Sequence, residues 1–131
     1  MQRRTYLKTA LAVAAASPLL SGAADTKGRI QLHVDLTVLP AKEKQMLDHF
    51  HKVFKPAASK MNGYINVEIL KLRSTLAGSA PASVNYRFVL TYESEELRQK
   101  WIASDVHQKV WPPIEKTLAH TKYNVILFDY A

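Results

Sequence analysis

Apolar and polar residues alternate along three segments of the chain, a pattern typical of β-strands with one buried face. The three segments cover residues 30–38, 64–72 and 84–93, and a fourth strand is predicted over residues 123–130. The apolar positions are Ile30, Leu32, Val34, Leu36 and Val38 in the first segment, Ile65, Val67 and Ile69 in the second, and Tyr86, Phe88, Leu90 and Tyr92 in the third.

Between the first two strands the apolar residues recur every three or four positions, which predicts an amphipathic helix. Pro40 suits the first turn of this helix, and Asn62-Gly63 suits its C-terminal end. The predicted apolar stripe consists of Met46, Leu47, Phe50, Val53, Phe54, Ala57, Ala58 and Met61.

A second helical region is predicted after the third strand. Ser94 is a good N-cap, and the Glu95-Glu96 pair that follows is favourable against the helix dipole. Asp105 and Gln108 have the spacing of a further capping box. Pro112-Pro113 then predicts a short helical piece that reaches about residue 120.

This order of elements, β-α-β-β-α-β, predicts an α+β fold, the ferredoxin-like plait with an antiparallel sheet. Helices on one face of such a sheet leave the other face bare. That face is too polar for a core and mixed enough to pack against the sheet of a partner. Its predicted residues are Gln31, His33, Asp35, Asn66, Glu68, Arg87 and Thr91.

The first 24 residues have the three parts of a cleavable export signal. A basic head, Arg3-Arg4-Thr5-Tyr6-Leu7-Lys8, is followed by the uncharged stretch Thr9–Leu20 and by the small residues Gly22-Ala23-Ala24. The head matches the twin-arginine consensus apart from Gln2 before the pair. We therefore expect a signal over residues 1–24, a domain over residues 25–131 and a periplasmic or extracellular location. The alternative is an ordinary amphipathic first helix.

Charge and cysteine content narrow the function classes. The formal charge of +7 falls to +4 without residues 1–24, which contain Arg3, Arg4 and Lys8 and no acid. No basic stripe interleaved with aromatic residues is visible, so a nucleic-acid partner is not expected. The apolar stretch of the signal is too short for a stable membrane anchor. The chain contains no Cys, which excludes disulfides and a lipid-anchored lipoprotein. A small exported domain without disulfides usually needs either a well-packed core or a partner subunit.

The segment 93–107 resembles the antibiotic biosynthesis monooxygenase (ABM) family of the dimeric α+β barrel superfamily. It reads Glu93-Ser94-Glu95-Glu96-Leu97-Arg98-Gln99-Lys100-Trp101-Ile102-Ala103-Ser104-Asp105-Val106-His107. The resemblance extends through Met61-Asn62-Gly63-Tyr64 and the closing strand, over nearly all of residues 30–130. It implies a homodimer whose sheets face each other, with a pocket between sheet and helices in each subunit. Some members oxidise phenolic or quinol-like compounds with O2 and without metal or flavin, others degrade haem, and many have no assigned activity.

The haem-degrading members provide a partial match. Trp101 and the five residues after it resemble the segment that holds the pocket tryptophan of those enzymes. Their iron-ligating His would fall at Trp111 here, and their first-strand Asn at about Val34. Two of the three residues that haem chemistry needs are therefore missing.

Cofactor-free oxygenation needs a base and a dry aromatic pocket. His107 is the candidate base, because its ordinary pKa of about 6.5 lets it accept a proton near neutral pH; it also matches the His that follows the helix's small residue in many ABM sequences. The candidate substrate-binding walls are Trp101, Trp111, Tyr86, Tyr92 and Phe50. The structural alternatives are a half-exposed helix residue for His107, a core residue for Trp101 and a dimer contact for Trp111.

No metal site or cofactor is predicted. His49 and His51 are two residues apart and lie on different helix faces. His33 and Asp35 share a strand face and could bind a metal only with a third ligand, so a polar pair at a dimer interface is the favoured interpretation. The leading hypothesis is thus an exported homodimer that acts as a cofactor-independent monooxygenase on a small aromatic or quinol-like substrate. A non-catalytic dimer that binds a small hydrophobic ligand is the alternative, ahead of a haem-binding member.

Overall fold

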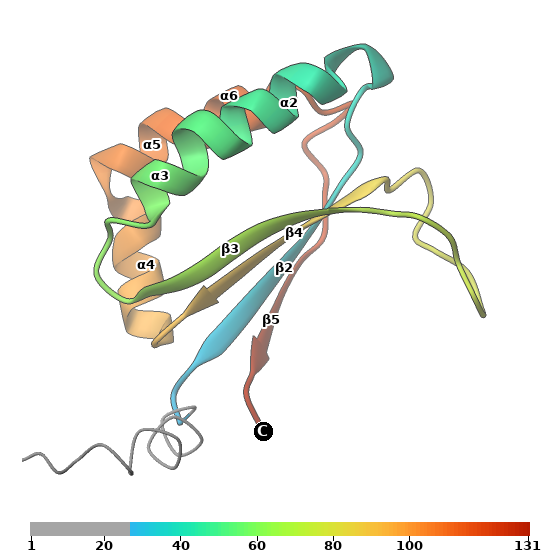
Figure 1. Cartoon of the computed structure of the whole chain (residues 1–131). Helices are drawn as coiled ribbons and strands as arrows, with labels where there is room; N and C mark the ends of the chain where they lie inside the picture. The colour runs from blue at the N-terminus through green and yellow to red at the C-terminus, as the bar shows by residue number, and fades with distance from the viewer. Residues whose placement is uncertain (1–26) are drawn as a thin grey trace, which may run out of the picture.

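A four-stranded antiparallel sheet with helices over one face forms the domain (Figure 1). The computed structural model describes residues 27–131, so the predicted twin-arginine signal lies outside the described residues. The strand order is β3-β4-β2-β5. This confirms the ferredoxin-like plait. The strands are β2 (Ile30–Leu36), β3 (Tyr64–Lys71), β4 (Tyr86–Tyr92) and β5 (Val125–Asp129).

The first helical arm changes its winding along its length. A 3-10 turn (Pro40–Lys42) leads into α2 (Glu43–His49), a π-helical segment (Phe50–Phe54) and α3 (Lys55–Ala58). Met46, Phe50, Phe54 and Ala58 are all buried and lie four residues apart. The wider π turn keeps residues at this spacing on one face of the arm.

One residue of the predicted apolar stripe is exposed, and the arm ends at a glycine. Val53 was predicted in the apolar stripe but is 45% exposed, because the stripe advances in steps of four rather than three. The chain leaves the arm through Gly63, whose φ of +91° suits a residue without a side chain. A Cβ atom at this position would lie 2.7 Å from Cδ1 of Leu97.

The second arm consists of α4 (Glu95–Ala103), α5 (Asp105–Val110) and α6 (Pro112–Glu115). The predicted cap is confirmed, since the Ser94 hydroxyl accepts a hydrogen bond from the Leu97 N–H at 3.2 Å. The second cap is Ser104 rather than the predicted Asp105. Its hydroxyl accepts from the His107 N–H at 3.2 Å, and Asp105 is already the first helical residue.

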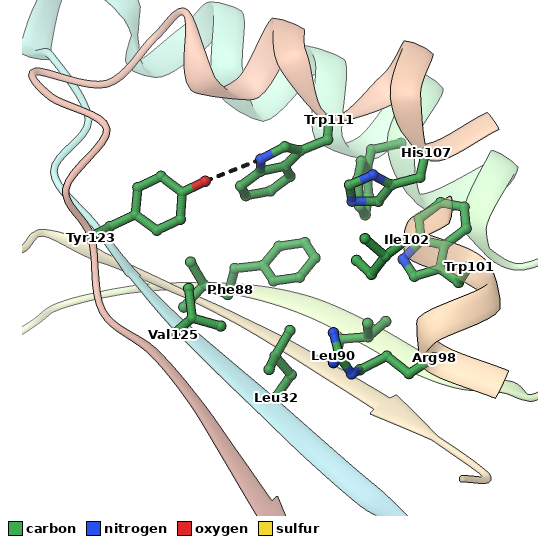
Figure 2. A pocket seen from close by; sticks show the side chains of 12 residues that line it. Leu32, Phe88, Leu90, Arg98, Trp101, Ile102, His107, Trp111, Tyr123 and Val125 are labelled. Carbon is green, nitrogen blue, oxygen red and sulfur yellow. Dashed lines mark hydrogen bonds between the residues drawn. The ribbon is translucent and has the colours of Figure 1, made fainter. Parts of the chain in front are cut away.

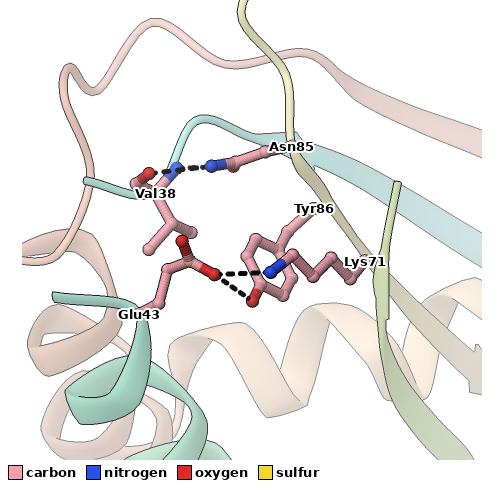
Figure 3. A network of polar contacts seen from close by, with 5 residues as sticks. All are labelled: Val38, Glu43, Lys71, Asn85 and Tyr86. Atoms are coloured by element: carbon pink, nitrogen blue, oxygen red, sulfur yellow. Dashed lines mark hydrogen bonds and ion pairs between the residues drawn. The ribbon is translucent and has the colours of Figure 1, made fainter. Parts of the chain in front are cut away.

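A polar network joins the N-terminal end of β4 to the first helical arm (Figure 3). The Tyr86 hydroxyl donates to Oε1 of Glu43 at 2.8 Å, and Nζ of Lys71 donates to the same oxygen at 3.0 Å. The hydrogen bond from Lys71, followed by that from Tyr86, lowers the pKa of Glu43. The Asn85 side chain accepts from the Val38 N–H at 2.8 Å and donates to the Val38 carbonyl at 2.9 Å. The Tyr86 hydroxyl therefore makes a structural contact between β4 and the first arm.

The face of the sheet away from the helices is mixed in character. Strand pairing places Ile126 opposite His33 and Phe128 opposite Gln31, so these apolar side chains share the bare face with the predicted polar residues. Leu70 is paired with Arg87 on the same face. Leu70, Ile126 and Phe128 are each more than 40% exposed. Within residues 27–131, no helix has the length and apolar character that a membrane span requires.

Candidate functional site

A cavity of about 200 Å³ lies between the helices and the sheet (Figure 2). Both helical arms and three strands contribute to its walls. The lining residues are Leu32, Val34, Phe54, Phe88, Leu90, Arg98, Trp101, Ile102, His107, Trp111, Tyr123 and Val125. Most of them are apolar or aromatic, as is usual for sites that bind small organic molecules.

His107 lies between the two tryptophans of the chain. Trp101 meets its imidazole edge-on, with ring centroids 5.0 Å apart and 88° between the planes. Trp111 lies nearly parallel to it, with centroids 6.2 Å apart and 17° between the planes. The short helices α4 and α5 produce this arrangement, because the Ser104 cap turns the chain between Trp101 and His107.

The surroundings of the His107 ring favour its neutral form. Burial lowers the pKa of His107 below 6.5, and nearby Arg98 lowers it further, while Glu115 acts in the opposite direction. Nδ1 of His107 is buried and has no hydrogen-bond partner among the described residues. A buried polar atom without a partner is costly, and this unmet hydrogen-bonding capacity distinguishes His107 from the other lining residues.

A hydrogen-bonded chain runs along another wall of the cavity. The Trp111 indole N–H donates to the Tyr123 hydroxyl at 3.2 Å, and that hydroxyl donates to Oε2 of Glu115 at 2.6 Å (Figure 2 shows the first bond). Burial, with the Glu115 hydrogen bond second, raises the pKa of Tyr123 to about 12. Tyr123 is thus a protonated phenol near neutral pH, and it fixes the orientation of the Trp111 ring.

Arg98 brings a permanent positive charge to the cavity. Its Nε donates to Oε1 of Glu95 at 2.6 Å, and its Nη2 donates to Oε2 of the same residue at 2.7 Å. The Arg98 side chain is 16% exposed. A bidentate pair of this kind fixes the plane of the guanidinium group.

Three of the six predicted site residues meet in this cavity, namely His107, Trp101 and Trp111. Tyr86, Tyr92 and Phe50 are not among the lining residues. Tyr86 binds Glu43 at the far end of β4, and Tyr92 is buried at the other end of the strand. Phe50 lies behind the lining, stacked at 5.8 Å on Phe54 and edge-on to Phe88.

Several lining residues are not among those predicted from the sequence. Arg98 lies three residues before Trp101, the spacing at which side chains share a helix face, and this signal was available. Phe54 and Phe88 were placed correctly on apolar faces, but nothing in the sequence distinguished them from their neighbours along those faces. Tyr123 approaches from the loop before β5, a long-range contact without a local signal.

The described residues contain no group of three His, Cys, Asp or Glu side chains that could hold a metal ion. His33 instead contacts Oε1 of Gln31 at 2.7 Å, and Asp35 accepts a hydrogen bond from Nε of Arg87 at 2.7 Å. Val34 and Trp111, which occupy the positions of the haem-binding Asn and His in the resemblance, both line the cavity. Both positions therefore lie at the cavity, but valine and tryptophan do not supply the amide and imidazole groups of the haem-degrading enzymes.

Solved structures with this fold include several ABM proteins. The chain is similar to two proteins provisionally named as antibiotic biosynthesis monooxygenases, one from Caulobacter crescentus CB15 and one from Bordetella bronchiseptica. For the first the TM-score is 0.63 at 17% identity, covering 79% of this chain and 91% of the other; for the second it is 0.64 at 17% identity, covering 79% and 98%.

Two further structures bear on chemistry and assembly. SnoaB from Streptomyces nogalater, described as a cofactor-independent oxygenase, matches with a TM-score of 0.61 at 11% identity, covering 77% of this chain and 91% of SnoaB. A dimeric ferredoxin-like protein of unknown function from Jannaschia sp. CCS1 matches with a TM-score of 0.66 at 12% identity, covering 79% and 100%. No protein-family model matches the chain, and no curated protein is significantly similar to it in sequence. At these identities the similarity establishes the shared fold.

Proposed function

We propose that the chain is an ABM-type monooxygenase that oxidises a small aromatic or quinol-like substrate without a cofactor. The observation that carries this proposal is the neutral, partly unpartnered imidazole of His107, held between Trp101 and Trp111 in an apolar cavity. A neutral imidazole can accept a proton, and the aromatic walls suit a flat ring.

The reaction would begin with transfer of a proton from a substrate hydroxyl to the His107 ring. The resulting anion is electron-rich and can supply the electrons that reduce O2. One oxygen atom forms a bond to a ring carbon and the other leaves as water. For a hydroquinone, the products are a hydroxylated quinone and one water molecule, and the substrate itself is the reductant. The fold that the chain shares with SnoaB, which is described as a cofactor-independent oxygenase, supports this assignment.

Oxygen uptake tests the proposal. The purified chain is incubated with a panel of hydroquinones under air, and O2 consumption and products are measured for the native chain and for His107→Ala. His120→Ala is the matched control, because His120 is exposed and is not among the cavity-lining residues. Uptake that is lost in His107→Ala and retained in His120→Ala supports the monooxygenase. Ligand binding without O2 uptake in the native chain would instead support the non-catalytic ligand-binding dimer.

We propose in addition that two copies of the chain pair through their bare sheet faces. The exposed side chains of Leu70, Ile126 and Phe128 support this pairing, since burial of exposed apolar area favours association. A dimeric protein with the same fold provides further support.

The export route rests on the sequence of the first 24 residues. We propose that the chain leaves the cytoplasm by the twin-arginine pathway and works in the periplasm or outside the cell. Replacing Arg3 and Arg4 with Lys should leave the chain in the cytoplasmic fraction of cells that express it. Unchanged export of this variant would contradict the proposed route.

A further inference from the structure

Arg98 is the one cavity-lining residue in the described part of the chain that carries a permanent positive charge. The rest of the lining is aliphatic or aromatic, apart from neutral His107 and the phenol of Tyr123. A guanidinium group in such surroundings is a strong recognition element for an anionic group on a ligand, because charge-assisted hydrogen bonds gain strength where water is scarce.

The pairing of Arg98 with Glu95 determines which edge of the guanidinium is available. Glu95 uses the edge formed by Nε and Nη2. The edge formed by Nη1 and Nη2 therefore lies away from Glu95. This edge offers two parallel N–H donors in the geometry that a carboxylate accepts. In Figure 2 the Arg98 side chain extends from α4 with its nitrogen atoms toward the strands that form the cavity floor.

Glu95 positions Arg98 without cancelling its charge completely. It lies in the first turn of α4, where the positive end of the helix dipole offsets part of the carboxylate charge. Gln99 also donates a hydrogen bond to Oε2 of Glu95, at 2.9 Å. Glu95 is thus held from two sides, and the guanidinium plane is fixed before a ligand arrives.

The volume of the cavity limits the rest of the ligand. An apolar cavity of about 150 Å³ is sufficient to bind benzene in an engineered protein. The cavity here measures about 200 Å³, which accommodates one substituted ring and little more. Fused rings or a haem macrocycle would extend beyond its walls.

We propose that the cavity selects a single-ring aromatic carboxylate, with the ring against Trp101 and Trp111 and the carboxylate on the Nη1–Nη2 edge of Arg98. A dihydroxybenzoate has this chemistry. The inference rests on the proposed function, because it takes this cavity as the substrate site. It assigns Arg98 as the residue that determines specificity.

Binding under anaerobic conditions tests the inference apart from turnover. The two tryptophans of the chain both line the cavity, so intrinsic fluorescence reports its occupancy. The probes are 2,5-dihydroxybenzoate, its neutral amide 2,5-dihydroxybenzamide, and the corresponding dihydroxynaphthalene carboxylate. The variants are Arg98→Met and, as the matched control, Lys100→Met, which removes the same charge from an exposed position of the same helix.

The native chain should bind the benzoate about 10- to 100-fold more tightly than the amide, the range expected for hydrogen bonds to a charged group. Arg98→Met should abolish this preference, Lys100→Met should retain it, and the naphthalene acid should bind more weakly than the benzoate. Arg98→Lys covers the case in which Arg98→Met fails to fold, and it should reduce the preference because Lys lacks the planar fork.

Equal binding of acid and amide by the native chain would overturn the inference, as would a preference that persists in the Arg98 variants. Tighter binding of the naphthalene acid would overturn the size limit. The two proposals fail separately. Acid-selective binding without O2 uptake removes the monooxygenase and leaves Arg98 selectivity intact, whereas O2 uptake from neutral hydroquinones without acid preference does the reverse.

Discussion

The imidazole of His107 lies almost parallel to the indole of Trp111, with 17° between the two planes. The residues are four positions apart, the spacing at which side chains on a helix are neighbours. One turn of helix therefore places the candidate base next to an aromatic wall. A substitution that moves one of the two rings should also change the position of the other.

The lowered pKa of His107 should be visible in the pH dependence of stability. Burial favours the neutral ring in the folded chain, so the unfolded chain binds a proton more readily at pH values between the two pKa values. The free energy of unfolding should be highest above about pH 7 and should fall as the pH drops below about 6.5. Urea unfolding between pH 5 and 8 measures this slope, and His107→Gln should reduce it.

His33 acts in the same pH range and needs its own control. Burial, then the charge of Arg87, lowers the pKa of His33, while Asp35 acts in the opposite direction. His33→Gln should remove a separate part of the slope, and the double variant should remove both parts. A slope that is identical in the native chain and the His107 variant would contradict the buried neutral ring.

Tyr123→Phe should lower the free energy of unfolding by about 1–2 kcal/mol. The substitution leaves the Trp111 indole N–H and the Glu115 carboxylate without their shared hydroxyl partner. The emission of Trp111 should shift as its ring loses this restraint. Tyr130→Phe is the control, because its hydroxyl makes an exposed contact with Gln31 and its loss should cost less than about 0.5 kcal/mol.

Gly63→Ala should destabilise the fold more than Gly78→Ala. Both glycines have positive φ, so each substitution costs about 1–2 kcal/mol in backbone strain. Only the Cβ at position 63 meets Leu97, at 2.7 Å, and this clash should add about 1–3 kcal/mol. Leu97→Ala should relieve only part of this clash, because the Leu97 Cβ itself lies 2.8 Å from the added methyl group. A double-mutant cycle of Gly63→Ala and Leu97→Ala should therefore show that the double variant loses less stability than the sum of the single variants. Strict additivity would place the strain elsewhere.

Titration with hemin should produce no shift of the Soret band. The position of the iron-ligating His is occupied by Trp111, whose N–H is already donated to Tyr123. Val34, at the position of the pocket Asn, has no polar group, and the cavity volume suits one ring. A saturable Soret shift at equimolar hemin would revive the haem interpretation.

Phe128→Asp should convert a dimer in solution into a monomer. A carboxylate at this exposed position of the bare sheet face would have to lose its hydration in a sheet-to-sheet dimer, which opposes association. Light scattering gives the mass of both forms. Leu76→Asp, at an exposed loop position, should leave the mass unchanged. A monomeric native chain would remove the sheet-to-sheet dimer.

The strands and the covered face of the sheet could be predicted because their signal is local. The apolar residues that alternate over 30–36 and 86–92 are all buried, although the structure also buries Asp35, Val89 and Thr91 on the other face of the sheet. The helix cap at Ser94 could be predicted because the N-cap preference depends on the residue type at a single position. The second cap moved by one position because Ser104 and Asp105 are both good caps, and only the backbone decides between them.

The site was harder to predict than the fold, because an apolar face does not show which part of it lies beneath a cavity. Tyr86, Phe88, Leu90 and Tyr92 all face the helices, yet only Phe88 and Leu90 line the space. The choice depends on how the two helical arms cross the sheet, which is a tertiary property. His107, Trp101 and Trp111 were found together because short helices keep residues that are close in sequence close in space.

The π-helical segment Phe50–Phe54 determines where the first arm can change in length. Its wider turn lets Phe54 and Ala58 follow Met46 and Phe50 along one face. Deleting one residue within this segment would restore regular winding and keep Ala58 close to the face of Met46. Deleting one residue from α2 or α3 instead would turn everything beyond it by roughly 100° about the helix axis. Related chains whose first arm differs in length by one residue should therefore differ within the π-helical segment.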